Sequence, residues 1–199
     1  MKILLIGASG TLGSAVAEEL APRHDIVRIG RNSGDEQMDI SDSVSIRKLF
    51  ERIGTFDALV CAAGNVTFAT LDEMNASHFA LGLQDKLMGQ VNLLLIGREF
   101  AREGASFTFT SGVLSHEPIR AGASASLVNG ALDAFVRAAA IEMPRGMRVN
   151  SVSPTVVAEA MASYAPYFRG FKPVPAAEVA LAYAKSVEGL QTGQNYRVG

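Results

Sequence analysis

Short apolar runs alternate with longer segments of helical periodicity along nearly the whole chain. A short run that is almost wholly apolar is typical of a strand buried on both faces, as strands are in a parallel sheet. Strand, helix and strand in succession need right-handed crossovers, so the pattern predicts a doubly wound α/β fold. The predicted strands are residues 2–6, 26–29, 58–61, 106–110, 148–152 and 195–198, and the predicted helices are 12–20, 44–53, a long region ending near 100, 129–143 and 176–187.

The length and composition predict one domain over residues 1–199. Hydrophobic residues make up 48% of the 199 residues and charged residues 19%, which supplies one packed core and argues against disorder. The segment 154–175 is irregular, with prolines, a glycine and the aromatic residues Tyr164, Tyr167 and Phe168, and we interpret it as a mobile flap.

Charge and motif content exclude several classes of function. With 18 basic and 20 acidic residues and no run of Lys or Arg, the chain lacks the basic patch that nucleic acids require. The first apolar run stops at Gly7, too short for a signal peptide core or a membrane span, so we expect no membrane partner. Cys61 is the only cysteine, which fits a cytoplasmic protein, and His24, His78 and His116 lack the spacing of metal ligands.

The stretch GASGTLG joins the first predicted strand to the first predicted helix. Glycines at such a junction let backbone amides approach a pyrophosphate, whose charge the helix N-terminus favours. They can also serve only a tight turn and close helix packing, but the strand before and the helix after favour nucleotide binding. The predicted contacts are Gly7, Ser9, Gly10, Thr11, Leu12 and Gly13.

With this loop, the chain resembles the short-chain dehydrogenase/reductase family over nearly its whole length. The family's usual pattern is Gly-x-x-x-Gly-x-Gly, whereas GASGTLG has Gly-x-x-Gly-x-x-Gly, which is closer to the extended and atypical branches. The resemblance implies a Rossmann-type parallel sheet of about seven strands in the order 3-2-1-4-5-6-7, flanked by helices. It also implies a nicotinamide cofactor and a homodimer or homotetramer, for which the apolar stretch VNLLLIG is suited.

The end of the second strand favours NADP(H), with NAD(H) as the open alternative. Relatives that select NAD place an acidic residue there, but this chain has Gly30 followed by Arg31. A guanidinium matches a 2′-phosphate, although a lone Arg at a strand end is often only a solvated surface group. Arg31, Asn32 and Ser33 are therefore predicted to contact the cofactor.

Two further stretches resemble cofactor contacts of the family. In QMDISD, Asp39 and Ile40 resemble the pair whose aspartate meets the adenine amine. In CAAGN, Ala62, Ala63 and Gly64 resemble the Asn-Ala-Gly segment after the fourth strand, without its first Asn.

The family's catalytic residues are only partly present. Ser111 resembles the catalytic Ser, although a serine that leaves a strand is also an ordinary turn residue. The family's general acid is a Tyr, and a Lys four residues later lowers the pKa of that Tyr. Counting back from Glu142 places Ala125 at the Tyr position and Asn129 at the Lys position, so both groups are missing.

Compared with the family, the chain also has two residue types in exchanged positions. The family's Asn on the preceding helix aligns with Lys86, and the family's Lys aligns with Asn129. This chain therefore has a Lys where the family has Asn and an Asn where it has Lys. We expect Lys86 to reach the pocket of the usual Lys. A lysine that only lies along a helix surface is the alternative. His116 is a candidate substitute acid because histidine is the usual acid–base residue of active sites, and a solvated loop residue is its alternative. Tyr164 and Tyr167 in the flap are candidates too, or hydrophobic cover.

Two functions follow as hypotheses. The first is an NADP(H)-dependent oxidoreductase of a small carbonyl or alcohol substrate with a non-standard active site. The second is a catalytically inactive NADP(H)-binding sensor or scaffold protein of the same fold. Under either hypothesis, we expect Pro154 to contact the cofactor. Pro154 and Thr155 align with the family's Pro-Gly pair, so Thr155 replaces the glycine.

Overall fold

Seven parallel strands form one sheet in the order β3-β2-β1-β4-β5-β6-β7, which confirms the predicted order. The computed structural model describes all of residues 1–199. Six strands overlap the segments that the sequence pattern placed, although β5 begins at Ala101, five residues before the predicted start at 106. Strand β3 has only two residues, too few to produce a recognisable apolar run. The strands are β1 Lys2–Ile6, β2 Asp25–Gly30, β3 Glu36–Gln37, β4 Phe56–Cys61, β5 Ala101–Thr110, β6 Arg148–Pro154 and β7 Asn195–Val198.

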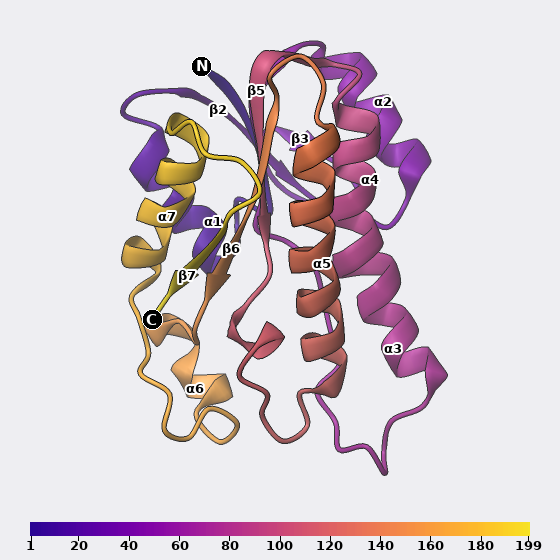
Figure 1. The fold of residues 1–199 in the computed structure, drawn as a ribbon, viewed down its shortest axis with the longest axis vertical. Helices are drawn as coiled ribbons and strands as arrows, with labels where there is room; N and C mark the ends of the chain where they lie inside the picture. The colour runs from indigo at the N-terminus through magenta and orange to yellow at the C-terminus, as the bar shows by residue number, and fades with distance from the viewer.

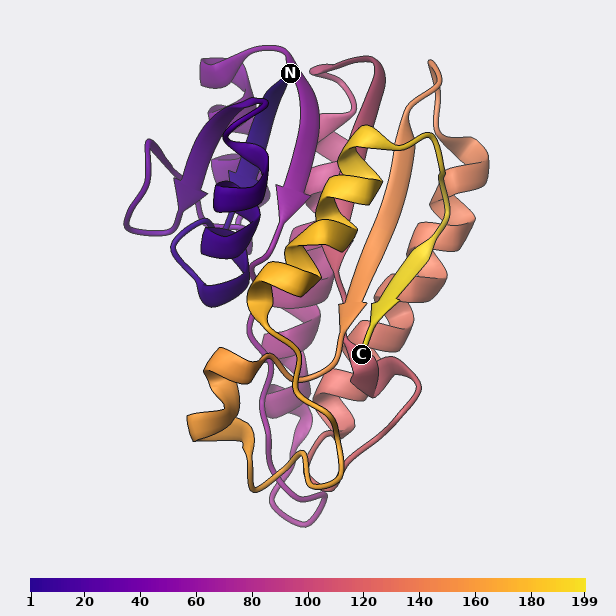
Figure 2. The same ribbon diagram turned by 90° about the vertical axis from the view of Figure 1, so that its left-hand side faces the viewer.

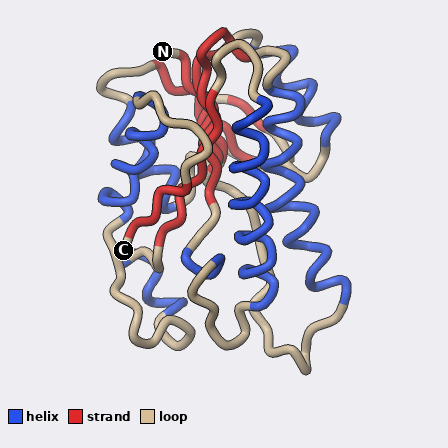
Figure 3. Tube along the Cα trace, in the orientation of Figure 1, coloured by secondary structure: helices blue, strands red, loops and turns tan.

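Helices cover both faces of the sheet, as Figures 1 and 3 show. Helices α1 (Thr11–Leu20) and α7 (Ala176–Glu188) lie on one face, and α2 (Ser43–Ile53), α4 (Met88–Gly97) and α5 (Ala123–Glu142) lie on the other. Each layer buries its own apolar core against the strands, because strands such as β4 are buried along nearly their whole length. None of the helices is both long enough and apolar enough to cross a lipid bilayer.

The long helical region predicted to end near residue 100 is interrupted in its middle. Helix α3 (Ala76–Gly82) passes into a π-helical turn, η1 (Leu83–Leu87), which continues as α4. Such turns occur mostly as local insertions in α-helices and often mark functional sites. Helix α5 begins at Ala123, earlier than the predicted residue 129, because the small residues before Asn129 also favour a helix.

All strands point toward the same end of the domain, where α6 (Met161–Tyr164) lies (Figure 2). In open parallel sheets the carboxyl ends of the strands carry the ligand site. The segment that we interpreted as a flap crosses this end and includes the short turn η3 (Ala158–Ala160) and α6. Val157 and Val174 pair as an isolated parallel bridge, which ties the beginning of the segment to its end.

Candidate active site

The glycine loop is shaped by close backbone approach. Gly7 has a φ of +82°, and a Cβ there would lie 2.7 Å from the carbonyl oxygen of Ala62. A Cβ on Gly13 would overlap the carbonyl oxygen of Gly7, so α1 packs directly on the loop. No side chain caps α1 at Gly10, which leaves the amides of its first turn free for an anion. These features fit the pyrophosphate of a dinucleotide.

A cavity of about 360 Å³ opens beside this loop and is lined by half of the predicted cofactor residues. It lies between the carboxyl ends of β1, β2 and β4, where the adenosine half of a dinucleotide would lie in this fold. The predicted residues that line it are Gly7, Ser9, Gly10, Arg31, Ile40, Ala62, Ala63 and Gly64, and the others are Ile6, Gly30, Met38, Asn65 and Asp85.

Arg31 is held at the edge of this cavity by acidic side chains. Its Nη2 lies 3.0 Å from Asp39 Oδ1 and 3.8 Å from Asp85 Oδ2, and half of the side chain is exposed. Ser9 and Ser33 approach each other nearby, with 3.5 Å between their hydroxyl oxygens. Arg31 and the two serines thus gather cationic and neutral donors, as a phosphate group needs.

Asp39 does not line the cavity, although we expected it to meet the adenine amine. Its Oδ1 accepts hydrogen bonds from the backbone amide (2.9 Å) and the hydroxyl (2.7 Å) of Ser41, as well as from Arg31. The Ser41 bonds lower the pKa of the Asp39 carboxyl. Four other predicted residues line neither this cavity nor the second one described below: Thr11, Gly13, Asn32 and Ser33.

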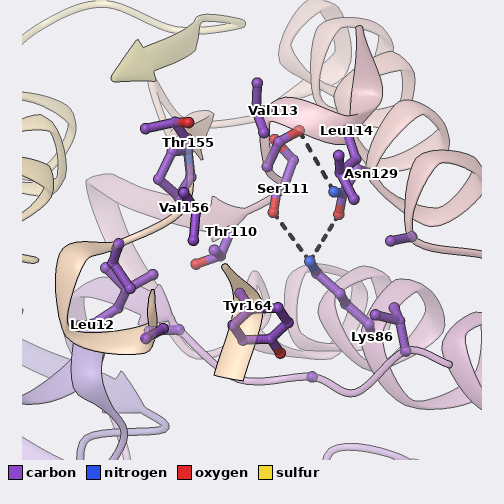
Figure 4. A pocket seen from close by; sticks show the side chains of 18 of the residues that line it. Leu12, Lys86, Thr110, Ser111, Val113, Leu114, Asn129, Thr155, Val156 and Tyr164 are labelled. Atoms are coloured by element: carbon purple, nitrogen blue, oxygen red, sulfur yellow. Dashed lines mark hydrogen bonds between the residues drawn. The ribbon is translucent and has the colours of Figure 1, made fainter. Parts of the chain in front are cut away.

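A second cavity, of about 270 Å³, continues from the first because both are lined by Ala62, Ala63 and Gly64. Figure 4 shows it from close by, with Lys86, Ser111, Asn129 and Tyr164 directed toward it from different elements. The predicted residues Leu12 and Pro154 line it as well. The structure therefore brings together residues from the loop, β5, β6, α5 and the π-helical turn at the end of the sheet.

Lys86 and Asn129 meet inside this cavity. Lys86 Nζ lies 2.7 Å from Asn129 Oδ1 and 3.0 Å from the backbone oxygen of Ser111 (Figure 4). Burial lowers the pKa of the Lys86 ammonium to about 8, and Cys61 and Asp133 oppose that shift. An ammonium has three donors, so one N–H is left beyond the two acceptors.

Gln90 holds the turn that carries Lys86. In the completely buried Gln90, Nε2 donates to the backbone oxygens of Lys86 (3.0 Å) and Thr110 (3.2 Å). Its Oε1 accepts from the Thr110 amide at 2.8 Å. The Gln90 side chain therefore links the π-helical turn to the end of β5, and this link positions Lys86 relative to Ser111.

Ala125, which the sequence pattern aligned with the family's Tyr, lies in apolar packing. Ala125 is only 2% exposed and packs with Val113, Leu114, Val156 and Phe168. Ser111 is buried beside this cluster, and its hydroxyl makes two contacts of 3.5 Å, one with the Val152 oxygen and one with Asn195 Nδ2. Contacts of this length are weak, so the Ser111 hydroxyl is free to turn to a ligand.

The remaining candidate acids differ in their position relative to the cavity. Tyr164 lines the cavity and packs edge-on against Phe68, while Tyr167 is 43% exposed. His116 is exposed and does not line the cavity; its Nδ1 lies 3.1 Å from Ser115 Oγ and its Nε2 lies 3.9 Å from Glu117 Oε1. His116 follows the turn η2 (Val113–Ser115) and lies outside the lining of the cavity, so we give His116 no part in the site.

Sequence reasoning did not identify Asp85, Asn65, Gln90 and Thr110 at the site. Asp85 and Gln90 lie in a helical stretch that also contains the polar residues Gln84, Lys86 and Asn92, so nothing in the sequence distinguished them. Their burial depends on the π-helical turn, which periodicity does not predict.

Comparison with known proteins agrees with this geometry. The family model described as enoyl-(acyl carrier protein) reductase matches residues 8–189. The chain belongs to the short-chain dehydrogenase/reductase family. A similar curated protein is the short-chain dehydrogenase/reductase ATR9 of Stachybotrys chlorohalonatus, 28% identical, in an alignment covering 76% of this chain and 72% of the relative.

Solved structures of the same fold cover the whole chain. The crystal structure of the protein lin1944 from Listeria innocua is 50% identical, covers 100% of both chains and has a TM-score of 0.99. A small-chain dehydrogenase in complex with NADPH is 24% identical, with 100% and 96% of the two chains covered and a TM-score of 0.88. The second likeness shows the fold alone.

Proposed function

We propose that this protein is an NADP(H)-dependent oxidoreductase of small carbonyl or alcohol substrates in which Lys86 replaces the family's Tyr and Lys. One observation carries the proposal. Lys86 Nζ donates to Asn129 Oδ1 and to the Ser111 backbone oxygen in a cavity that continues from the cavity beside the glycine loop. When bound, the nicotinamide supplies or accepts the hydride. The glycine loop and the uncapped N-terminus of α1 hold its pyrophosphate.

Lys86 serves as the cation and proton donor of the site. A general acid works best when its pKa lies near the operating pH, and burial brings the pKa of Lys86 to about 8. Asn129 Oδ1 and the Ser111 backbone oxygen accept hydrogen bonds from two of its N–H groups and fix its direction, which leaves the third N–H for a substrate oxygen or a ribose hydroxyl. The Ser111 hydroxyl orients the same substrate oxygen.

The walls of the cavity indicate a small, apolar substrate. Val113, Leu114, Val156 and Phe168 line it, and its volume of about 270 Å³ lies at the small end for ligand pockets. Apart from Lys86, no charged side chain lines it, so a strongly charged substrate would find no second partner.

The test is NADPH binding followed by a panel of small aldehydes and ketones, with turnover measured as loss of the reduced nicotinamide signal. We expect turnover by the wild type and a loss of at least about 100-fold in kcat in Lys86→Met, since general acids contribute 10²–10⁴-fold. Lys48→Met, at an exposed lysine of α2, is the matched control. Unchanged kcat in Lys86→Met would refute the role of Lys86.

The preference for NADP(H) is a separate part of the proposal. It is supported by Gly30 at the end of β2, by Arg31 and Ser9 in the cavity, and by the NADPH bound to the structural relative. Arg31→Ala should weaken NADPH binding about 10- to 100-fold and leave NADH binding nearly unchanged, because charged hydrogen bonds contribute about 1.5–3 kcal/mol. Arg47→Ala, at an exposed arginine of α2, is the control.

A second candidate is the NADP(H)-binding sensor or scaffold without turnover. The apolar packing around Ala125 favours it, because no hydroxyl replaces the family's Tyr at that position. Tight NADPH binding without turnover across the panel would favour this candidate.

We also propose a homodimer or homotetramer built through α4 and α5. Leu95 on α4 and Leu127 and Ile141 on α5 are large apolar side chains left exposed by the single chain. Light scattering with size-exclusion chromatography tests this, and a monomer at micromolar concentration would contradict it.

A further inference from the structure

A chain of hydrogen bonds connects the buried carboxylate of Asp133 on α5 with the hydroxyl of Ser111. Ser151 Oγ, on β6, donates to Asp133 Oδ1 at 3.1 Å. Asn195 Nδ2, at the start of β7, lies 3.2 Å from Ser151 Oγ and 3.5 Å from Ser111 Oγ. Asp133 is 7% exposed, Ser111 is 3% exposed and Ser151 is completely buried, so the chain lies inside the protein and ends at the active site.

Asp133 fixes the direction of each hydrogen bond in this chain. A carboxylate can only accept, and Ser151 is the one residue that donates to the Asp133 side chain. The single hydroxyl proton of Ser151 is therefore committed to Asp133, which leaves the Ser151 oxygen as an acceptor. The Asn195 amide must then turn its NH₂ group toward Ser151, and the second N–H of that group points to Ser111.

The Ser111 oxygen receives this N–H, so the proton of the Ser111 hydroxyl is left to donate. Resting on the proposed function, we propose that Asp133 is a positioning residue that makes Ser111 a hydrogen-bond donor toward the substrate oxygen. Ser111 lines the cavity, and the other contact of its hydroxyl is the Val152 backbone oxygen at 3.5 Å. Both contacts are long, as hydrogen bonds of catalytic groups often are before the substrate binds.

Without the carboxylate the same chain can run in the opposite direction. In Asp133→Asn the new NH₂ group can donate to Ser151, whose own proton is then free for the Asn195 oxygen once that amide turns over. Asn195 Oδ1 has no partner in the protein, so nothing outside the chain holds the amide in its present orientation. The turned amide would accept from Ser111 and draw its proton away from the substrate, which removes a donor from the developing charge.

The kinetic experiment measures reduction of a carbonyl substrate with and without the Ser111 hydroxyl. We expect Asp133→Asn to lower kcat about 3- to 10-fold with little change in KM, because the lost hydrogen bond acts in the transition state. In the Ser111→Ala background the same substitution should lower kcat less than about 2-fold. A loss of equal size in both backgrounds would overturn the proposal, since Asp133 would then act elsewhere, for example through its charge on Lys86.

Two further variants sharpen the comparison. Ser151→Ala removes only the hydroxyl that joins Asp133 to Asn195, so it should lower kcat to a similar extent and should not add to Asp133→Asn. Full activity in Ser151→Ala would overturn the proposal even if Asp133→Asn does not fold. Asp72→Asn, at an exposed carboxylate outside both cavities, is the matched control and should leave kcat unchanged.

Neutron diffraction from the deuterated protein tests the direction of the chain without turnover. We expect the Ser151 deuteron to point to Asp133 and the ND₂ group of Asn195 to face both serine oxygens. A Ser151 deuteron that points to Asn195 would overturn the proposal, while turnover of a carbonyl substrate would still support the proposed function. If no carbonyl in the panel is reduced, the proposed function fails, and the role of Asp133 toward a substrate fails with it.

Discussion

Replacing Lys86 by Met should change how the stability of the fold depends on pH. In the folded protein, burial lowers the pKa of Lys86 from 10.5 to about 8, so a charged ammonium at this position is unfavourable. In the unfolded chain the amine keeps its proton until pH is near its ordinary pKa. Between these two values the unfolded state binds more protons than the folded state, so stability rises with pH.

The magnitude follows from the two pKa values. Their difference, 10.5 minus about 8, is about 2.5, and each pKa unit corresponds to about 1.4 kcal/mol, which gives about 3 kcal/mol. This contribution is complete above pH 10.5 and is lost as pH falls through about 8. Below pH 8 both states are protonated and the dependence on Lys86 ends.

The assay is urea unfolding followed by far-ultraviolet circular dichroism at several pH values between about 7 and 10. The free energy of unfolding of the wild type minus that of Lys86→Met should rise by about 2–3 kcal/mol over this range, since the other titrating groups cancel in the difference. Lys48→Met should give a difference that is flat. A flat difference for Lys86→Met as well would show that its ammonium is not desolvated, and the reasoning from burial would be refuted.

Other variants test the loop and the active-site exchange. Gly13→Ala should destabilise the fold by about 2 kcal/mol or more and abolish NADPH binding, since its Cβ would overlap the backbone of the loop. Gly130→Ala, in α5 with open space around it, should instead raise stability by about 0.5–1 kcal/mol, and thermal unfolding would detect both changes. Ala125→Tyr with Asn129→Lys places two amines together, so we expect reductase activity from the standard pair only when Lys86→Asn is added. Equal activity with and without Lys86→Asn would contradict that expectation.

Much of the fold could be predicted because its signals are local. The apolar runs of β1 and β4 and the periodicity of α2 lie within a few residues, and the glycine loop between β1 and α1 carries its own spacing. The absence of Tyr at Ala125 and of Lys at Asn129 was also readable, since the sequence pattern of α5 and β6 restricts the alignment.

The sequence alone therefore determined the order of six strands and of the main helices along the chain and the position of the glycine loop, and it predicted that the standard catalytic pair is missing. Only the tertiary structure decided that Lys86 and Asn129, 43 residues apart, lie 2.7 Å from each other. It also decided that Asp85, and not Asp39, lines the adenosine cavity. The physical reason is that contact and burial depend on how α5, β5 and the π-helical turn pack, whereas periodicity records only the preference of each segment for its own backbone conformation.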